Sequence, residues 1–151
     1  IVAYFQDRFL PVDEVTAQVV VEREPVVEFL PMNAPEASQQ IVSGIYDLEQ
    51  GAWRWMGEKA VMLLKRPAAP KPVEATFSIP GPAPARQVSL YIDNELAAQA
   101  NYATPGTYTL RSLNVEARSP TVTLTIAIDK SFKVPGDHRQ LGITLASAGF
   151  R

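Results

Sequence analysis

The sequence predicts an all-β domain, a two-sheet antiparallel β-sandwich of jelly-roll type with an N-terminal arm. Apolar and polar residues alternate with a period of two in several short runs, and thirteen prolines and eight glycines interrupt the chain between them. Period-two alternation buries one face of a strand, and many short strands separated by turn residues are typical of sandwiches and barrels. The Pro-rich stretches 67–72 and 80–84 lie between such runs and therefore predict inter-strand loops.

The expected strands lie mainly in the second half of the chain. The alternating runs cover residues 73–79, 87–92, 107–111, 121–128 and 141–145. Asp93 and Asn94 follow the second run and predict a tight hairpin turn, because both residues tolerate a left-handed backbone. The apolar run 60–64 does not alternate, so it predicts a central strand covered on both sides or a strand with a bulge. One short helix is expected over residues 34–40, with Asn33 as its N-cap.

Residues 1–36 are expected to form an acidic arm, and residues 37–151 the sandwich domain. The arm carries seven acidic residues against two arginines, a net charge of −5 in a chain whose total is −2. Its apolar runs 15–21 and 26–29 predict strands that join the sandwich or pack across one of its edges.

Composition argues against several classes of function. Without cysteine there is no disulfide, no thiolate nucleophile and no cysteine–zinc site. A net charge of −2 and a pI of about 5.4 argue against nucleic acid or an anionic membrane as the main partner, because both need a concentrated basic surface. No apolar run approaches the ~18–20 residues of a membrane span, so direct membrane insertion is not expected. The chain begins without methionine, which suggests a piece of a longer protein.

No catalytic residue, metal or cofactor is expected. The single histidine, His138, lies in a polar loop without a G-x-S-x-G motif, so a solvated surface position is the simpler interpretation. One histidine cannot build a histidine-based zinc site, and no D-x-D-x-D run supports calcium. Loop acids are available for glycoside hydrolysis but belong to no motif, so a weak hydrolase is a minor alternative. These acids are Asp47, Glu49, Glu58, Asp93, Glu95, Asp129 and Asp137.

The densest unusual segment spans residues 44–57 and holds both tryptophans and a tyrosine. Flat aromatic faces can receive the C–H face of a sugar ring, while arginine and glutamate bond its hydroxyls. The candidate ligand-binding residues of this segment are Tyr46, Glu49, Trp53 and Arg54. Alternatively, Trp53 and Trp55, two apart on a strand, point to the same side and fill the core. The core is favoured for Trp55, and both interpretations stay open for Trp53.

Two parts of the sequence resemble a domain family fused behind the membrane part of bacterial glycosyltransferases. In that family a Gly-aromatic-x-x-x-Glu segment leads to an Arg/Trp pair and an apolar strand, and a Phe-x-Pro turn precedes Asp-x-Arg-x-Leu-Gly and a last strand. The matching residues here are Gly44-Ile45-Tyr46, Glu49, Arg54-Trp55, and Phe132 to Ile143 with Asp137, Arg139 and Leu141-Gly142. Glu95 stands where the family's Val-Asn-Gly hairpin has glycine, so a different turn type is expected here.

This resemblance covers roughly residues 40–151 and implies a jelly-roll sandwich similar to carbohydrate-binding modules. It implies an extracytoplasmic location, periplasmic or on the outer face of the membrane, as part of a longer membrane protein. The expected role is a non-catalytic accessory module that contacts glycan, the parent's membrane segment or a neighbouring domain. A purely structural interaction domain without a small ligand is the competing interpretation.

The resemblance also adds Asp137 and Arg139 to the candidate ligand-binding residues. It places the segment around Glu49 and the Asp-x-Arg turn in the first and last parts of one domain. A planar guanidinium can bond a carboxylate bidentately and stack on an indole at once. We therefore expect a carboxylate to hold Arg139, with Glu49 as the preferred partner and Asp137 as the alternative.

Overall fold

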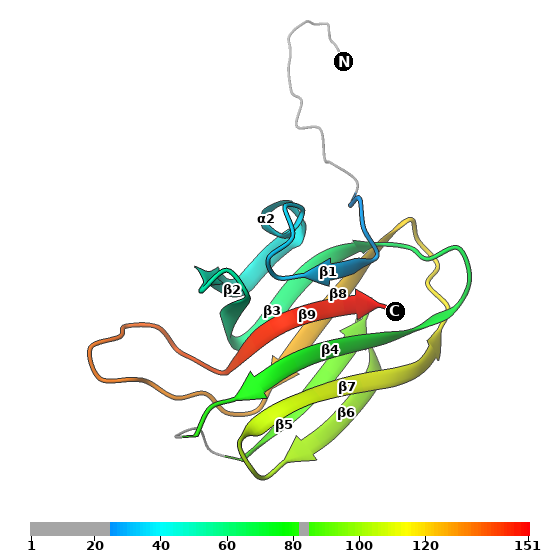
Figure 1. The fold of residues 1–151 in the computed structure, drawn as a ribbon. Helices are drawn as coiled ribbons and strands as arrows, with labels where there is room; N and C mark the ends of the chain where they lie inside the picture. Colours follow the sequence, from blue (N-terminus) through cyan, green and yellow to red (C-terminus); the bar gives the residue numbers. More distant parts are fainter. Residues whose placement is uncertain (1–24, 82–84) are drawn as a thin grey trace, which may run out of the picture.

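The computed structural model describes residues 25–81 and 85–151, and this part of the chain is an antiparallel β-sandwich (Figure 1). Its strands are β1 (Phe29–Pro31), β2 (Ile41–Glu49), β3 (Trp53–Lys65), β4 (Lys71–Ile79), β5 (Arg86–Ile92), β6 (Glu95–Tyr102), β7 (Gly106–Val115), β8 (Thr121–Ile128) and β9 (Ile143–Phe150). The helix within this part is α2 (Ala37–Gln40). The predicted all-β, jelly-roll-like sandwich is confirmed.

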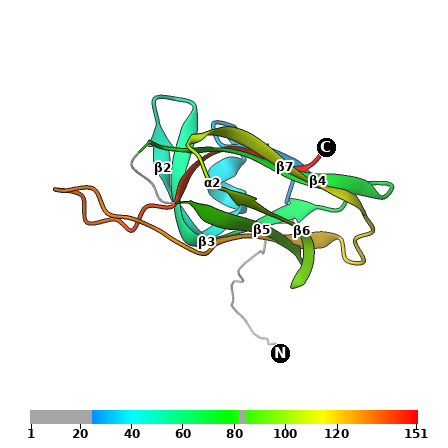
Figure 2. The same cartoon turned by 90° about the horizontal axis from the view of Figure 1, so that it is seen from below.

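The strands hydrogen-bond in the order β6-β5-β8-β3-β9-β4-β7 and fold into two layers (Figure 2). Strand β3 belongs to both layers, because its residues 54–56 pair with β9 and its residues 59–65 pair with β8. Strand β2 runs along β3, and β1 runs along β9. Strands β6 and β7 end the order and contact each other, so the sheet almost closes.

The core between the layers follows the alternation of the sequence. In β8 every second side chain, from Val122 to Ile128, is at most 6% exposed, and the same holds in β4 from Val73 to Ile79. Phe77 and Phe150 are the largest fully buried side chains. Burial of each such side chain contributes about 1.5–3 kcal/mol, which makes this alternation the main determinant of the fold.

The chain just before residue 37 also enters the core. Strand β1 pairs with β9, and Leu30 and Met32 are fully buried. The buried amide of Gln40 accepts hydrogen bonds from Val26 N and Val27 N and donates to Val27 O and to Leu63 O. This one side chain thereby ties the entry of the chain to β3. The expected run 15–21 lies outside the described residues, and the division at residue 36 stays a prediction.

Two local predictions in this entry segment are wrong. The strand expected over residues 26–29 begins at Phe29, and Val26 is 62% exposed. The helix begins at Ala37 with Glu36 as N-cap and no side-chain cap. Asn33, the predicted cap, instead donates to Gly51 O at 3.3 Å, because its amide faces the β2–β3 turn.

The Asp93-Asn94 hairpin is confirmed. Both residues have positive φ, 48° and 73°, and Ile92 pairs with Glu95 across the turn. The Asp93 carboxylate also accepts a hydrogen bond of 2.9 Å from Thr123 N, and this bond connects the turn to β8. Glu95 therefore fits where the family resemblance has glycine, because Asp93 and Asn94 adopt the left-handed conformations.

A bulge in β2 depends on Gly44. The register of β2 against β3 shifts on both sides of this glycine, whose φ is 81°. A Cβ atom at Gly44 would lie 1.8 Å from the carbonyl oxygen of Lys59. Only glycine allows β2 to approach β3 this closely with this backbone conformation.

We predict that Gly44→Ala lowers the free energy of unfolding by about 2 kcal/mol or more, because it combines left-handed strain with a backbone clash. Gly81→Ala is the matched control, since no heavy atom lies within 4 Å of a Cβ there. Urea unfolding of both variants provides the measurement. Equal stability of the two variants would contradict the proposed role of the bulge.

None of the helices in residues 25–81 and 85–151 has the length and hydropathy of a membrane span.

Candidate functional site

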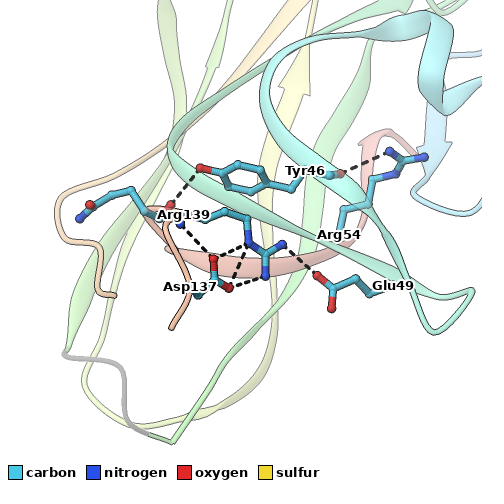
Figure 3. Close-up of polar contacts among 6 residues, drawn as sticks. Tyr46, Glu49, Arg54, Asp137 and Arg139 are labelled. Atoms are coloured by element: carbon cyan, nitrogen blue, oxygen red, sulfur yellow. Dashed lines mark hydrogen bonds and ion pairs between the residues drawn. The ribbon is translucent and has the colours of Figure 1, made fainter. Parts of the chain in front are cut away.

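Arg139 is held by two carboxylates at one end of the sandwich (Figure 3). Its Nη1 donates to Glu49 Oε2 at 3.0 Å, and its Nη2 donates to Asp137 Oδ2 at 2.7 Å. Its Nε lies 3.0 Å from Asp137 Oδ1 and 3.1 Å from Oδ2. The predicted contact of Arg139 with Glu49 is present, and the alternative partner Asp137 bonds the same guanidinium.

Tyr46 completes this group, which we call the Arg139 cluster (Tyr46, Glu49, Asp137 and Arg139). The guanidinium carbon of Arg139 lies 5.3 Å from the centroid of the Tyr46 ring, within cation–π range. The Tyr46 hydroxyl also donates to Gln140 O at 3.5 Å. One aromatic side chain therefore supports both the arginine and the backbone that follows it.

Two elements far apart in sequence build the cluster. Tyr46 and Glu49 belong to β2, whereas Asp137 and Arg139 belong to the loop between β8 and β9, which extends from the same end of the molecule (orange in Figure 1). That loop is closed at its base by two backbone hydrogen bonds between Phe132 and Leu141, of 2.7 and 2.9 Å. The contacts of Arg139 therefore hold the β8–β9 loop against the β2–β3 hairpin.

Trp53 lies beside this cluster, and two more aromatic side chains continue from it. Trp53 stands directly opposite Glu49 in the β2–β3 register, so their side chains share a face. Trp53 contacts Trp55 edge to face, with centroids 6.1 Å apart, and Trp55 contacts Phe132 with centroids 5.9 Å apart. The two tryptophans do point to the same side, but both remain partly exposed. The core position favoured for Trp55 is therefore incorrect, because the loop covers it only in part.

Arg54 does not join the Arg139 cluster, and its side chain points away from Arg139 (Figure 3). Its Nε donates to Met32 O at 3.0 Å and its Nη1 to Tyr46 O at 3.4 Å. Arg54 follows Trp53 in an extended strand, so their side chains face opposite sides. Conversely, Phe132 was not among the predicted candidates, and its place in the closing motif is the one sequence signal that points to it.

The cluster is partly exposed and carries a net negative charge. The side chains of Glu49, Asp137 and Arg139 are 35%, 25% and 32% exposed, and two carboxylates surround one guanidinium. Hydrogen bonds from the Arg139 side chain and backbone N–H lower the pKa of Asp137 to about 2. The hydrogen bonds to Asp137 and then Glu49 raise the pKa of Arg139. Asp137 is therefore ionised at neutral pH and unsuited to act as a general acid.

The remaining candidate groups make structural contacts or lie in solvent. Glu58 accepts a hydrogen bond from the Ser131 hydroxyl, and Asp129 accepts one from Gln87 N. His138 is exposed in the loop. Within residues 25–81 and 85–151, no three His, Asp or Glu side chains are grouped closely enough to hold a metal ion.

No family model matches this sequence, and no curated protein matches it. Among solved structures, the chain resembles a CBM36 carbohydrate-binding module in complex with calcium and xylotriose, with 10% identity over 74% of this chain and 99% of that chain and a TM-score of 0.45. It also resembles the CBM36-1 domain of a multidomain xylanase from the hindgut metagenome of Trinervitermes trinervoides, with 12% identity, coverage of 82% and 96%, and a TM-score of 0.48.

A third similar structure is a glycoside hydrolase family 43 arabinoxylan arabinofuranohydrolase from Bacillus subtilis in complex with cellotetraose. The identity is 7%, the TM-score is 0.41, and the match covers 81% of this chain and 23% of that one. At these identities and TM-scores, none of the three assigns a family or a ligand to this chain.

The Asp137–Arg139 contact predicts a specific titration. A carboxyl group whose folded pKa is about 2, below the ordinary 3.8, contributes stability above pH ~4, and that stability is lost as the pH falls towards 2. NMR titration of the Asp137 side chain should give a midpoint near 2 in the wild type. Arg139→Gln should move the midpoint upward, towards 3.8. A wild-type midpoint near 3.8 that Arg139→Gln leaves unchanged would show that the ion pair does not form in solution.

Proposed function

We propose that this chain is a non-catalytic accessory module that binds glycan at the Arg139 cluster and the adjacent Trp53. The observation that carries the proposal is the arrangement of hydrogen-bonded charged groups beside a partly exposed indole on the β2–β3 hairpin. Such hydrogen-bonded groups need little further ordering when a ligand binds, which reduces the entropic cost of association. Arg54, with its side chain directed elsewhere, is assigned a structural role.

The chemistry of this surface suits the hydroxyl groups of a sugar. Arg139 bonds only one of the two Glu49 carboxylate oxygens, Oε2, and a carboxylate has about four acceptor positions. A sugar hydroxyl can therefore donate to Glu49 while the guanidinium keeps it oriented. Trp53 offers an apolar surface for the C–H groups of the ring. Because the cluster is net negative, the ligand of this site is a neutral saccharide and not an acidic one.

A purely structural role is the second candidate, and one observation favours it. The same three side chains tie the loop to the hairpin by contacts within the chain, and no ligand is needed to satisfy Arg139. In that case the cluster contributes to stability alone, and loss of one of its charged hydrogen bonds should lower the free energy of unfolding by ~1–3 kcal/mol.

The wider context that we propose is an extracytoplasmic domain of a longer envelope protein, with a membrane glycosyltransferase as the preferred parent. Its support is the resemblance of the Gly44–Trp55 and Phe132–Ile143 segments to that domain family. In this setting the module contacts glycan, the parent's membrane segment or a neighbouring domain.

Titration calorimetry with neutral xylo- and gluco-oligosaccharides tests the binding proposal. We expect Trp53→Ala and Arg139→Lys each to weaken binding at least tenfold, because they remove the ring contact and the bidentate geometry. Arg111→Lys is the matched control: this arginine lies on β7, contacts Glu74 at 3.9 Å, and should keep the affinity within twofold.

Thermal unfolding of the same variants distinguishes the two candidates. Glycan binding predicts that Glu49→Gln changes stability by about 1 kcal/mol or less while it weakens binding. Loss of stability in Glu49→Gln and Arg139→Lys, without saccharide binding to the wild type, would instead support the structural role.

A further inference from the structure

A hollow lies on the outer surface of the layer that contains β3, β5 and β8, away from the Arg139 cluster. It has a volume of about 330 Å³ and is lined by Lys59, Tyr91, Asn94, Thr125 and Ala127. This volume is at the lower end of the range of small-ligand sites. None of its lining residues belongs to the Arg139 cluster.

The register of three neighbouring strands explains why the surface is hollow there. Tyr91 of β5 stands opposite Thr125 of β8, and Lys59 of β3 stands opposite Ala127 of the same central strand. Long side chains therefore rise on both outer strands, while short side chains form the floor between them. Lys59 and Tyr91 stand diagonally across β8, so with strands about 4.8 Å apart and about 3.4 Å per residue along a strand their backbones are separated by about 12 Å. That width accommodates one sugar ring lying on the floor.

The chemistry of the hollow is cationic and amphipathic. Lys59 and Asn94 are exposed, and Tyr91 is partly exposed. The outward-facing positions of β3, β8 and β5 beside the hollow, all within the described part of the chain, carry Lys59 and Lys65 and no Asp or Glu. The neighbouring acids Asp93 and Asp129 accept hydrogen bonds from the backbone, at Thr123 N and Gln87 N. The lining residues therefore carry one charge, the Lys59 ammonium group, and the exposed acids Glu58 and Glu95 adjoin Lys59 and Asn94 in sequence.

We propose that this hollow binds a uronic acid unit of an acidic glycan. The sugar carboxylate pairs with the Lys59 ammonium group, the ring packs on Tyr91, and the Asn94 amide bonds ring hydroxyls. The assignment goes beyond the proposed function and does not rest on it: this site is positive and selects an acidic sugar, whereas the Arg139 cluster is negative and selects a neutral one. One domain would then contact two chemically different parts of a heteropolysaccharide.

Tetragalacturonic acid and its methyl ester are the probes, because they share the same rings and differ in charge. We expect wild-type protein to bind the acid at least tenfold more tightly than the ester at low ionic strength, and the difference to shrink as salt screens the pair. Lys59→Gln and Tyr91→Ala should each weaken binding of the acid at least tenfold. Lys65→Gln is the matched control, since it lies on the same strand and face outside the hollow; its affinity should stay within twofold.

The Trp53→Ala variant distinguishes this proposal from glycan binding at the Arg139 cluster. It should leave tetragalacturonate binding unchanged, and circular dichroism confirms that each variant is folded. Unchanged binding of the acid in Lys59→Gln, or equal binding of acid and ester by the wild type, would overturn the assignment. Loss of binding in Trp53→Ala alone would move the acidic sugar to the Arg139 cluster and overturn it as well.

Discussion

Strand β3 forms backbone hydrogen bonds with three neighbouring strands, and the rest of the structure depends on where it changes from one partner to another. Its first part pairs with β9, its second part pairs with β8, and β2 follows it across both. A strand that passes from one layer to the other must change its partners near Gly57 and Glu58. This transition sets the path of β2, which follows β3 through register shifts around Gly44. The same path brings Glu49 opposite Trp53 at the end of the hairpin.

The transition in β3 also determines where the β8–β9 loop returns to the sandwich. Gly142 N donates to Met56 O at 2.8 Å, and a Cβ at Gly142 would lie 2.8 Å from Gly57 O and 2.1 Å from the Ile128 side chain. This close approach brings Arg139, three residues earlier, within reach of Glu49, although 90 positions separate them in sequence. Partly exposed ion pairs contribute little to stability. The cluster therefore orients groups that the backbone has already brought together.

Local patterns in the sequence predict the strands, but not how the strands combine. Alternation identifies β4, β5 and β8 because burial of one face repeats every two residues, and Asp93-Asn94 identifies a turn whose conformation is intrinsic to those residues. The run 60–64 predicts only the C-terminal part of β3, because the extension of the strand back to Trp53 depends on its partners β2 and β9. Gln40 ties the chain entry to β3 through a backbone carbonyl 23 residues away, which no local pattern reveals.

The sequence likewise predicts some contacts of the candidate site and not others. The contact of Arg139 with Glu49 and Asp137 follows from complementary charge and from the order of motifs in the chain. The direction of Arg54 follows only once the strand is placed, because alternation puts it on the face opposite Trp53. The exposure of Trp55 depends on how far the loop with Phe132 covers it, a tertiary contact without a local signature.

The most direct test of the central claim is a map of chemical-shift changes in the ¹⁵N-labelled protein, as neutral xylo- and gluco-oligosaccharides are added. A glycan at the Arg139 cluster should produce its largest changes at the Trp53 indole N–H, the Arg139 Nε–H and the backbone amides of residues 46–49 and 137–140. Changes confined to other surfaces, or the absence of changes with every saccharide, would contradict the account.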